Sequence, residues 1–188
     1  AFNHRFAQPS NQSYPNFGHR FPFADDSLTD PVTEETSGLL DRSRATGATP
    51  KVIYTNSSAE YWRGDCALMH IDPLGATDLR PAAETRIYHF AGTQHGAGSL
   101  PLSRDGAAEG ARGRYDYNVL DHSPLMRAAL INLDRWVSDG VEPPPNRHPQ
   151  LSDGTLANPE ETLAVFDRLP DMVTPDRSRL FILRTVDL

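Results

Sequence analysis

The chain has 188 residues, enough for one domain with an appendage at roughly 150 residues a domain. It carries 18 Lys and Arg against 25 Asp and Glu, and this net charge of −7 argues against a protein that neutralises nucleic-acid phosphates. Cys66 is the only cysteine, which excludes an intrachain disulfide and a cysteine-based zinc site. No apolar run approaches the roughly 18 residues that span a bilayer, so no membrane span is predicted.

The first 35 residues are predicted to form a loop-rich segment that packs on the domain. They show no helical or strand period and are broken by prolines at positions 9, 15, 22 and 31. A short helix is expected next, capped by Thr36 or Ser37 and stopped at Gly47.

Two short runs in the middle of the chain, 51–55 and 86–90, have the β-branched and aromatic composition of strands. A helix is predicted over 57–70 and a turn over 72–75. A helix between two buried strands is typical of a βαβ unit, so we expect both strands to lie parallel in one sheet. A glycine-rich loop follows at 91–98, and 99–122 is expected to be an excursion with little structure of its own.

The clearest predicted element is a helix over 123–139. Ser123 is its expected N-cap, Pro124 occupies the first helical position, and Gly140 stands just past the end. Its apolar residues recur at helical spacing and are expected to be buried against the sheet: Leu125, Ala129, Leu133 and Trp136. Beyond the helix, Pro143–Pro145 breaks the chain, and a last strand is predicted at 180–183.

Two residues that can carry chemistry follow the two predicted strands. Glu60 comes after 51–55, and His95 comes after 86–90 in a loop whose glycines allow a sharp turn. A carboxylate after one late strand and a histidine after the next is the order in which a hydrolytic triad follows the strands of an α/β hydrolase. This order indicates Glu60 as the triad acid and His95 as the triad base.

Each of these residues also has a purely structural interpretation. Ser57-x-x-Glu60 is a capping-box pattern, in which the carboxylate returns to the N-cap amide. His95 can be a turn residue that bonds its own backbone. Asp65 and Asp72 remain alternative acids, although both also fit a helix face or a turn.

The remaining histidines do not indicate a metal site. His70, Asp72, His89 and His95 lack a compact ligand spacing such as two histidines one helical turn apart, so no metal and no cofactor are predicted. His89 lies inside the second strand and is interpreted as a structural neighbour of the site.

Three stretches of the sequence resemble a bacterial family of large α/β-hydrolase-domain proteins. They are Arg5-Phe6-Ala7-Gln8-Pro9-Ser10, Tyr54-Thr55-Asn56-Ser57-Ser58-x-Glu60-Tyr61-Trp62, and Arg86-Ile87-Tyr88-His89-Phe90-Ala91-Gly92-Thr93-Gln94-His95-Gly96. The resemblance extends over about residues 1–156 and includes Trp136-Val137 and Pro143–Pro145. Family members are much longer than this chain.

The resemblance implies an α/β fold, in which this chain is the C-terminal portion of an α/β-hydrolase-type sheet with helices on both faces and long loop insertions. The implied divisions are the segment 1–35, the hydrolase part 36–142, and a Pro-rich extension 143–188. The nucleophilic serine is expected upstream, because the 188 residues contain no Gly-x-Ser-x-Gly.

The function implied by the resemblance is serine-type hydrolysis of a small-molecule ester, with His95 and Glu60 as the catalytic residues in this chain. The implied macromolecular partner is the rest of its own α/β-hydrolase domain, and neither nucleic acid nor a cofactor is expected. The alternative is a non-catalytic α/β interaction or binding module. Substrate identity, compartment and oligomeric state stay open.

Overall fold

The computed structural model describes residues 21–63, 66–105 and 112–176. The chain forms two compact units. One comprises the described parts of 1–50, 61–83 and 149–188, and the other comprises 51–60 and the described parts of 84–148. The second unit contains both predicted strands, Glu60 and His95, so it carries the candidate chemistry.

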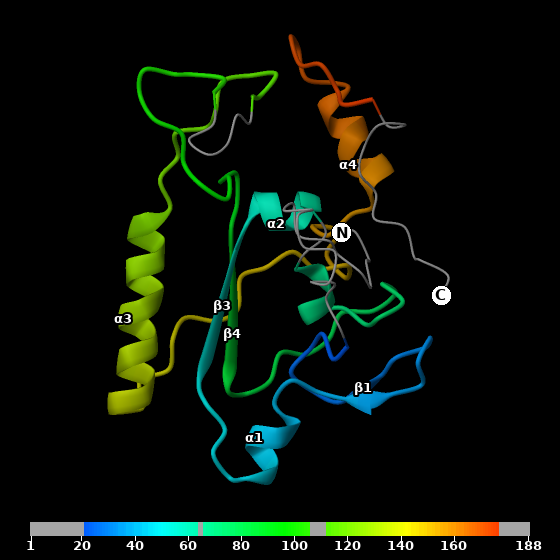
Figure 1. Cartoon of the computed structure of the whole chain (residues 1–188), viewed down its shortest axis with the longest axis vertical. Coiled ribbons are helices and arrows are strands. Elements are labelled where there is room, and N and C mark those ends of the chain that lie inside the picture. The colour runs from blue at the N-terminus through cyan, green and yellow to red at the C-terminus, as the bar shows by residue number, and fades with distance from the viewer. Residues whose placement is uncertain (1–20, 64–65, 106–111, 177–188) are drawn as a thin grey trace. The chain divides into compact units, whose positions relative to one another are not determined.

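The second unit is built on two parallel strands, β3 (Val52–Ser57) and β4 (Thr85–Phe90), which run side by side in Figure 1. Their register pairs Val52 with Thr85 and Ser57 with Phe90. The predicted parallel pairing is therefore confirmed. Parallel strands of equal length end at the same edge of a sheet, which brings the segments after Ser57 and after Phe90 together.

Helix α3 (Ser123–Asp139) packs along β3 in the same unit. Gly140 ends it in the left-handed conformation, with φ 70°, as the sequence predicts for a residue without a Cβ. The N-cap is His122, so Ser123 is the first helical residue and not the predicted cap. Ser123 instead bonds the carboxylate of Asp121 through its amide and hydroxyl.

The predicted apolar stripe of α3 is only partly buried. Ala129 and Trp136 are buried, and Leu133 is half-buried. The ring of Trp136 lies under two cations, with Lys51 Nζ at 4.6 Å and Arg86 Cζ at 4.7 Å from its centroid. The prediction is wrong for Leu125, which is 50% exposed because it borders a cavity of about 340 Å³ at the end of β4 in place of packed side chains.

The chain after α3 returns along the second edge of β4. Arg147 donates its amide to Ile87 O at 2.9 Å and accepts from the His89 amide at 2.7 Å, which forms a parallel bridge opposite Tyr88. Asn146 Oδ1 accepts the Ile87 amide at 2.8 Å. Backbone groups of β4 are therefore bonded from both sides at this level.

Within its described residues, the first unit is built from short elements. β1 (Leu28–Thr29) and β2 (Thr36–Ser37) are antiparallel, and α1 (Asp41–Ala45) follows them. The prediction that Thr36 or Ser37 caps this helix is wrong, because both residues lie in β2 and Leu40 is the N-cap. Gly47 lies beyond the helix with φ 71°, which agrees with the predicted stop.

The predicted helix over 57–70 is broken into α2 (Ser58–Arg63) and a 3-10 turn, η1 (Ala67–Met69). A turn at 72–75 is present as predicted, closed by the Gly75 amide on Asp72 O. The core of this unit gathers four buried residues: Ala67, Leu68, Ile71 and Leu156.

Helix α4 (Pro159–Phe166) was not predicted, although its start has a recognisable pattern. Asn158 and Glu161 form a complete capping box around Pro159 at the first helical position. The strand predicted at 180–183 and most of the loop segment 1–35 lie outside the described residues. Within the described residues, no helix has both the length and the apolar composition to cross a bilayer.

Candidate active site

The ends of the two parallel strands bring Glu60 and His95 to one place. β3 ends at Ser57 and α2 begins directly, so Glu60 stands in the first helical turn. β4 ends at Phe90, and Gly92 then turns the chain with φ 74°. Because Gly92 has no Cβ, it adopts this conformation without strain and leads the loop back toward α2.

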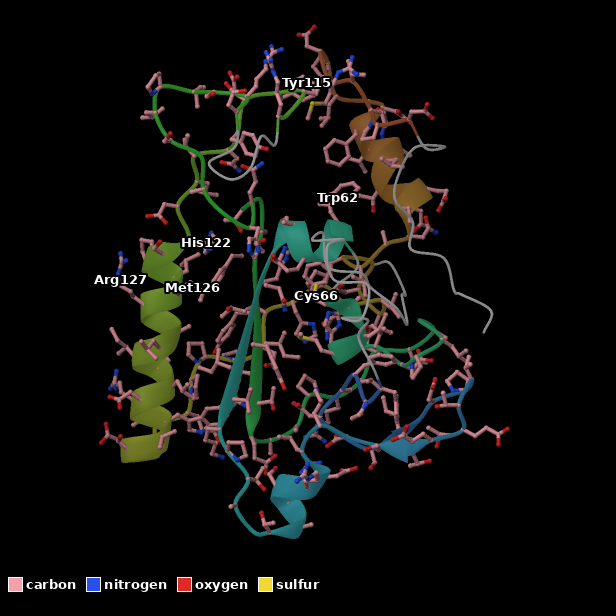
Figure 2. The ribbon with its side chains drawn as sticks, viewed as in Figure 1. Trp62, Cys66, Tyr115, His122, Met126 and Arg127 are labelled. Carbon is pink, nitrogen blue, oxygen red and sulfur yellow. The ribbon has the colours of Figure 1, made fainter. Side chains whose placement is uncertain are left out.

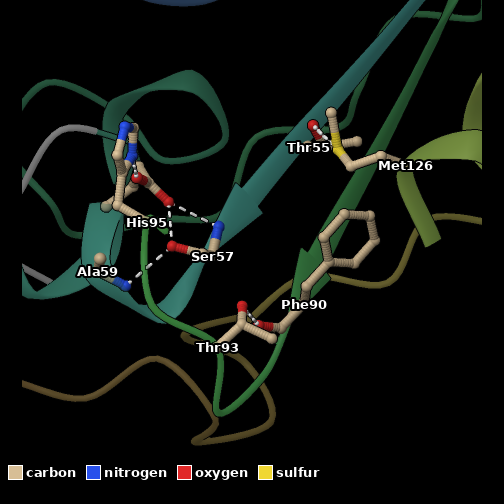
Figure 3. Close-up of polar contacts among 8 residues, drawn as sticks. Thr55, Ser57, Ala59, Phe90, Thr93, His95 and Met126 are labelled. Carbon is tan, nitrogen blue, oxygen red and sulfur yellow. Dashed lines mark hydrogen bonds and ion pairs between the residues drawn. The ribbon is translucent and has the colours of Figure 1, made fainter. Parts of the chain in front are cut away.

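His95 Nδ1 lies 2.7 Å from Glu60 Oε1 (Figure 3). The second carboxylate oxygen, Oε2, accepts the Ser57 amide at 2.7 Å and the Ser57 hydroxyl at 2.5 Å. The structural and the chemical interpretations of Glu60 are therefore both present in one carboxylate, since one oxygen caps the helix and the other holds the imidazole. The predicted contact between the two residues is confirmed, although its catalytic role is not tested by this geometry.

The protonation of the pair follows from its surroundings. Burial would raise the pKa of Glu60, but the hydrogen bonds from Ser57 and His95 outweigh it and hold the pKa below its ordinary value. An ionised carboxylate can only accept, so His95 Nδ1 carries the proton and, in the neutral ring, Nε2 is the acceptor. The His95 side chain is 75% exposed whereas that of Glu60 is 16% exposed.

Ser58 fastens the His95 loop to the helix that carries Glu60. Its amide donates to Thr93 O at 3.1 Å, and its hydroxyl accepts the Gly92 amide at 2.9 Å. The same hydroxyl lies 3.2 Å from His89 Nε2. Burial lowers the pKa of His89, which favours a neutral ring beside Ser58 despite the nearby charge of Glu60. His89 therefore contacts the residue that fastens the loop, which agrees with its interpretation as a structural neighbour of the site.

A cavity of about 360 Å³ opens beside the Glu60–His95 pair. Its wall is formed by the end of β3, the end of β4 and the start of α3, and its lining residues are Thr55, Asn56, Ser57, Glu60, Phe90, His95, His122 and Met126. Thr55 Oγ1 donates to Met126 Sδ at 3.3 Å across this space. Figure 2 shows Met126 directed toward the strands and Arg127 directed away from them.

Sequence reasoning did not find Phe90, His122 or Met126 as neighbours of the site. Phe90 and His122 pack ring on ring, with centroids 6.0 Å apart and an interplanar angle of 32°. Phe90 is the last residue of β4 and stands in the third family-like stretch, but the pattern does not mark it as a site residue. His122 and Met126 belong to no motif, and only the packing of α3 beside the strands brings them to the cavity.

The alternative acids are placed differently. Asp65 lies outside the described residues. Asp72 accepts the amides of Leu74, Ala76 and Thr77, and these bonds outweigh its slight burial and lower its pKa. Asp72 is thus a turn residue. Among the described residues, no group of three or more His, Cys, Asp or Glu side chains is placed to hold a metal ion.

The geometry agrees with comparison to known proteins. A family model described as an alpha/beta hydrolase domain matches residues 11–173 of the chain. No curated protein and no solved structure matches the chain. Since the family model covers most of the 188 residues, the chain belongs to the alpha/beta hydrolase domain family.

Proposed function

We propose that this chain supplies the acid and the base of a serine-type ester hydrolase, with Glu60 and His95 in these roles. The observation that carries the proposal is the 2.7 Å contact between Glu60 Oε1 and His95 Nδ1, made by a carboxylate that Ser57 already holds. A triad base needs one nitrogen fixed by a carboxylate and the other free to face a nucleophile.

The nucleophile in this proposal is a serine outside the 188 residues, because they contain no Gly-x-Ser-x-Gly. Its hydroxyl attacks the carbonyl carbon of a small-molecule ester while His95 Nε2 takes the hydroxyl proton. His95 returns this proton to the alcohol oxygen as the carbon–oxygen bond breaks, and the acyl group stays on the serine. Water then attacks the acyl-enzyme with His95 again as base, which releases the acid and restores the serine.

Glu60 has two tasks in this mechanism. Its negative charge stabilises the imidazolium that forms on His95 in each half-reaction, and its Oε1 fixes the tautomer in which Nε2 is free to accept. The lowered pKa of Glu60 serves both tasks, because the carboxylate stays ionised at neutral pH.

The test uses the protein with its complete hydrolase domain and a chromogenic ester such as p-nitrophenyl acetate. His95→Ala should lower kcat by about 10⁶-fold, and Glu60→Gln by about 10⁴-fold, by analogy with the triad of a serine protease. His89→Gln is the matched control, because Gln keeps a group that can bond the Ser58 hydroxyl and His89 transfers no proton in the proposed mechanism, so the variant should cost no more than about tenfold.

Hydrolysis that survives His95→Ala within about tenfold would refute the proposed role of His95. A protein with no esterase activity that still binds a partner through this unit would favour the interaction module. If Asp72→Asn lowers kcat as much as Glu60→Gln is expected to, the acid is wrongly assigned.

A further inference from the structure

The excursion between His95 and α3 closes on itself at its base. In the described residues 98–105 and 112–118, the Gly98 amide donates to Asn118 O at 2.8 Å, and the Tyr117 amide donates to Ser103 O at 2.8 Å. Further along, the Gly113 amide donates to Arg104 O at 2.7 Å. The chain therefore leaves the His95 loop at Gly98 and returns to it at Asn118.

Asn118 bonds the His95 loop at three points. Its side-chain amide donates to Gly92 O at 2.5 Å, and its backbone amide donates to Gln94 Oε1 at 2.8 Å. Its carbonyl accepts the Gly98 amide. These contacts lie on both sides of His95, so one residue fixes the loop before and after the imidazole.

The loop needs such a support because its own composition gives it little rigidity. Gly92, Gly96 and Gly98 fall within seven residues, and glycine loses more conformational freedom on ordering than any other residue. The His95 ring is also largely exposed, so packing does not hold it. Besides its bond to Glu60, the imidazole is then positioned by the hydrogen bonds that hold the loop backbone.

The close approach at the base of the excursion requires a glycine at position 98. A Cβ on Gly98 would lie 2.8 Å from Tyr117 Cβ and 3.1 Å from Tyr117 O, so the two chain segments would have to separate. A Cβ on Gly96, two residues earlier, would meet no atom within 4 Å. The two glycines of one loop therefore form a matched pair for a test.

We propose that Asn118 is a positioning residue for His95: with Gly98, it clamps the 92–98 loop so that Nδ1 meets Glu60 and Nε2 faces the reacting groups. The inference rests on the proposed function, which gives His95 a task that depends on its position. Misplacing a catalytic group by about 1 Å can cost about 10²-fold in rate. Asn118 touches neither substrate nor nucleophile in this assignment.

The first experiment compares Asn118→Ala with the wild type in the protein with its complete hydrolase domain, using p-nitrophenyl acetate. The expected result is a fall in kcat of about 10²-fold with KM within about twofold, because the clamp positions the base and does not bind the ester. Asn118→Asp should also lower kcat, since it keeps the acceptor for the Leu120 amide but replaces the donor to Gly92 O. An unchanged kcat in both variants would overturn the inference.

A second experiment substitutes the two glycines and leaves Asn118 unchanged. Gly98→Ala should reproduce the loss in kcat, whereas Gly96→Ala should stay within about twofold of the wild type. Equal kcat values for the two alanine variants would contradict the clamp, even if Asn118→Ala fails to fold.

A third experiment reports the position of the His95 ring and does not depend on esterase activity. The ¹⁵N shifts of the His95 ring report which nitrogen carries the proton, and the Glu60 contact predicts the Nδ1–H tautomer in the wild type. Asn118→Ala should release the ring into a mixture of tautomers, and an unchanged Nδ1–H tautomer would count against positioning. If His95→Ala leaves esterase activity intact, the proposed function fails. The tautomer measurement still shows whether Asn118 positions the His95 ring.

Discussion

Ser57 donates both its backbone amide and its hydroxyl to a single oxygen of Glu60, and the same hydroxyl accepts the amide of Ala59 at 3.2 Å (Figure 3). These bonds orient the carboxylate without any contribution from His95. Two donors on Oε2 leave Oε1 directed at the imidazole. The orientation of the proposed acid is thus built into the junction between β3 and α2.

Removing the Ser57 hydroxyl should raise the pKa of Glu60. In Ser57→Ala the backbone donor remains while one donor to the charged form is lost, and burial continues to favour the neutral acid. A carboxyl-carbon NMR titration of Glu60 measures the shift, with Ser138→Ala as the control, because the Ser138 hydroxyl bonds Asp134 on α3 and not Glu60. A pKa that stays in place or falls after Ser57→Ala would show that the hydroxyl does not stabilise the charge.

The same lowered pKa predicts a pH dependence of stability. A carboxyl group with a folded-state pKa below its ordinary value of 4.5 stabilises the fold above that value, and the contribution is lost as the pH falls through the folded-state pKa. The free energy of unfolding of the wild type should therefore decrease relative to Glu60→Gln as the pH is lowered below about 4.5. Urea unfolding of both proteins across this range measures the difference, and a constant difference at all pH values would contradict the assignment.

Trp136 should be the main anchor of α3 on the sheet. It is buried, Lys51 and Arg86 lie over its ring, and Arg86 is further held by Glu142 at 2.9 Å. Trp136→Ala should destabilise the protein by about 3–5 kcal/mol, the range for deletion of a buried aromatic ring. Arg127→Ala on the same helix is the control, because the Arg127 side chain is exposed and directed away from the strands, so its truncation should change stability by less than about 0.5 kcal/mol (Figure 2). Equal effects in urea unfolding would mean that α3 is held in some other way.

The 188-residue chain on its own should be marginally stable and prone to self-association. Several large apolar side chains of α3 are exposed, among them Leu130, Ile131 and Val137, and an exposed apolar patch of this kind favours association. Analytical ultracentrifugation and calorimetry of the isolated chain test this expectation. A monomer with one cooperative thermal transition would count against the rest of the hydrolase domain as the partner of this face.

The features that the sequence predicts are those that follow from local pattern and strand order. The runs at 51–55 and 86–90 indicate two strands, their order indicates parallel pairing, and parallel pairing brings Glu60 to His95. The stop of α3 at Gly140 is equally local, because only a residue without a Cβ adopts that φ freely.

The features that escaped prediction depend on contacts between distant segments. Helical spacing places Leu125 on the buried stripe, but it does not show that a cavity lies opposite the first turn. Asn118 carries no motif, and its three contacts exist only because the excursion closes at Gly98. The start of α4 is different, since its capping box could have been recognised from Asn158 and Glu161.

The return of the chain along β4 has a consequence for the alignment of the two strands. A slip of β4 by one residue would move its side chains to the opposite face and shift the loop after Phe90 by about 3.3 Å, which is longer than the contact between His95 and Glu60. The bonds of Arg147 to Ile87 and His89 oppose that slip from the side away from β3. The Pro-rich segment after α3 therefore helps to fix the register of β4 on β3, and with it the separation between His95 and Glu60.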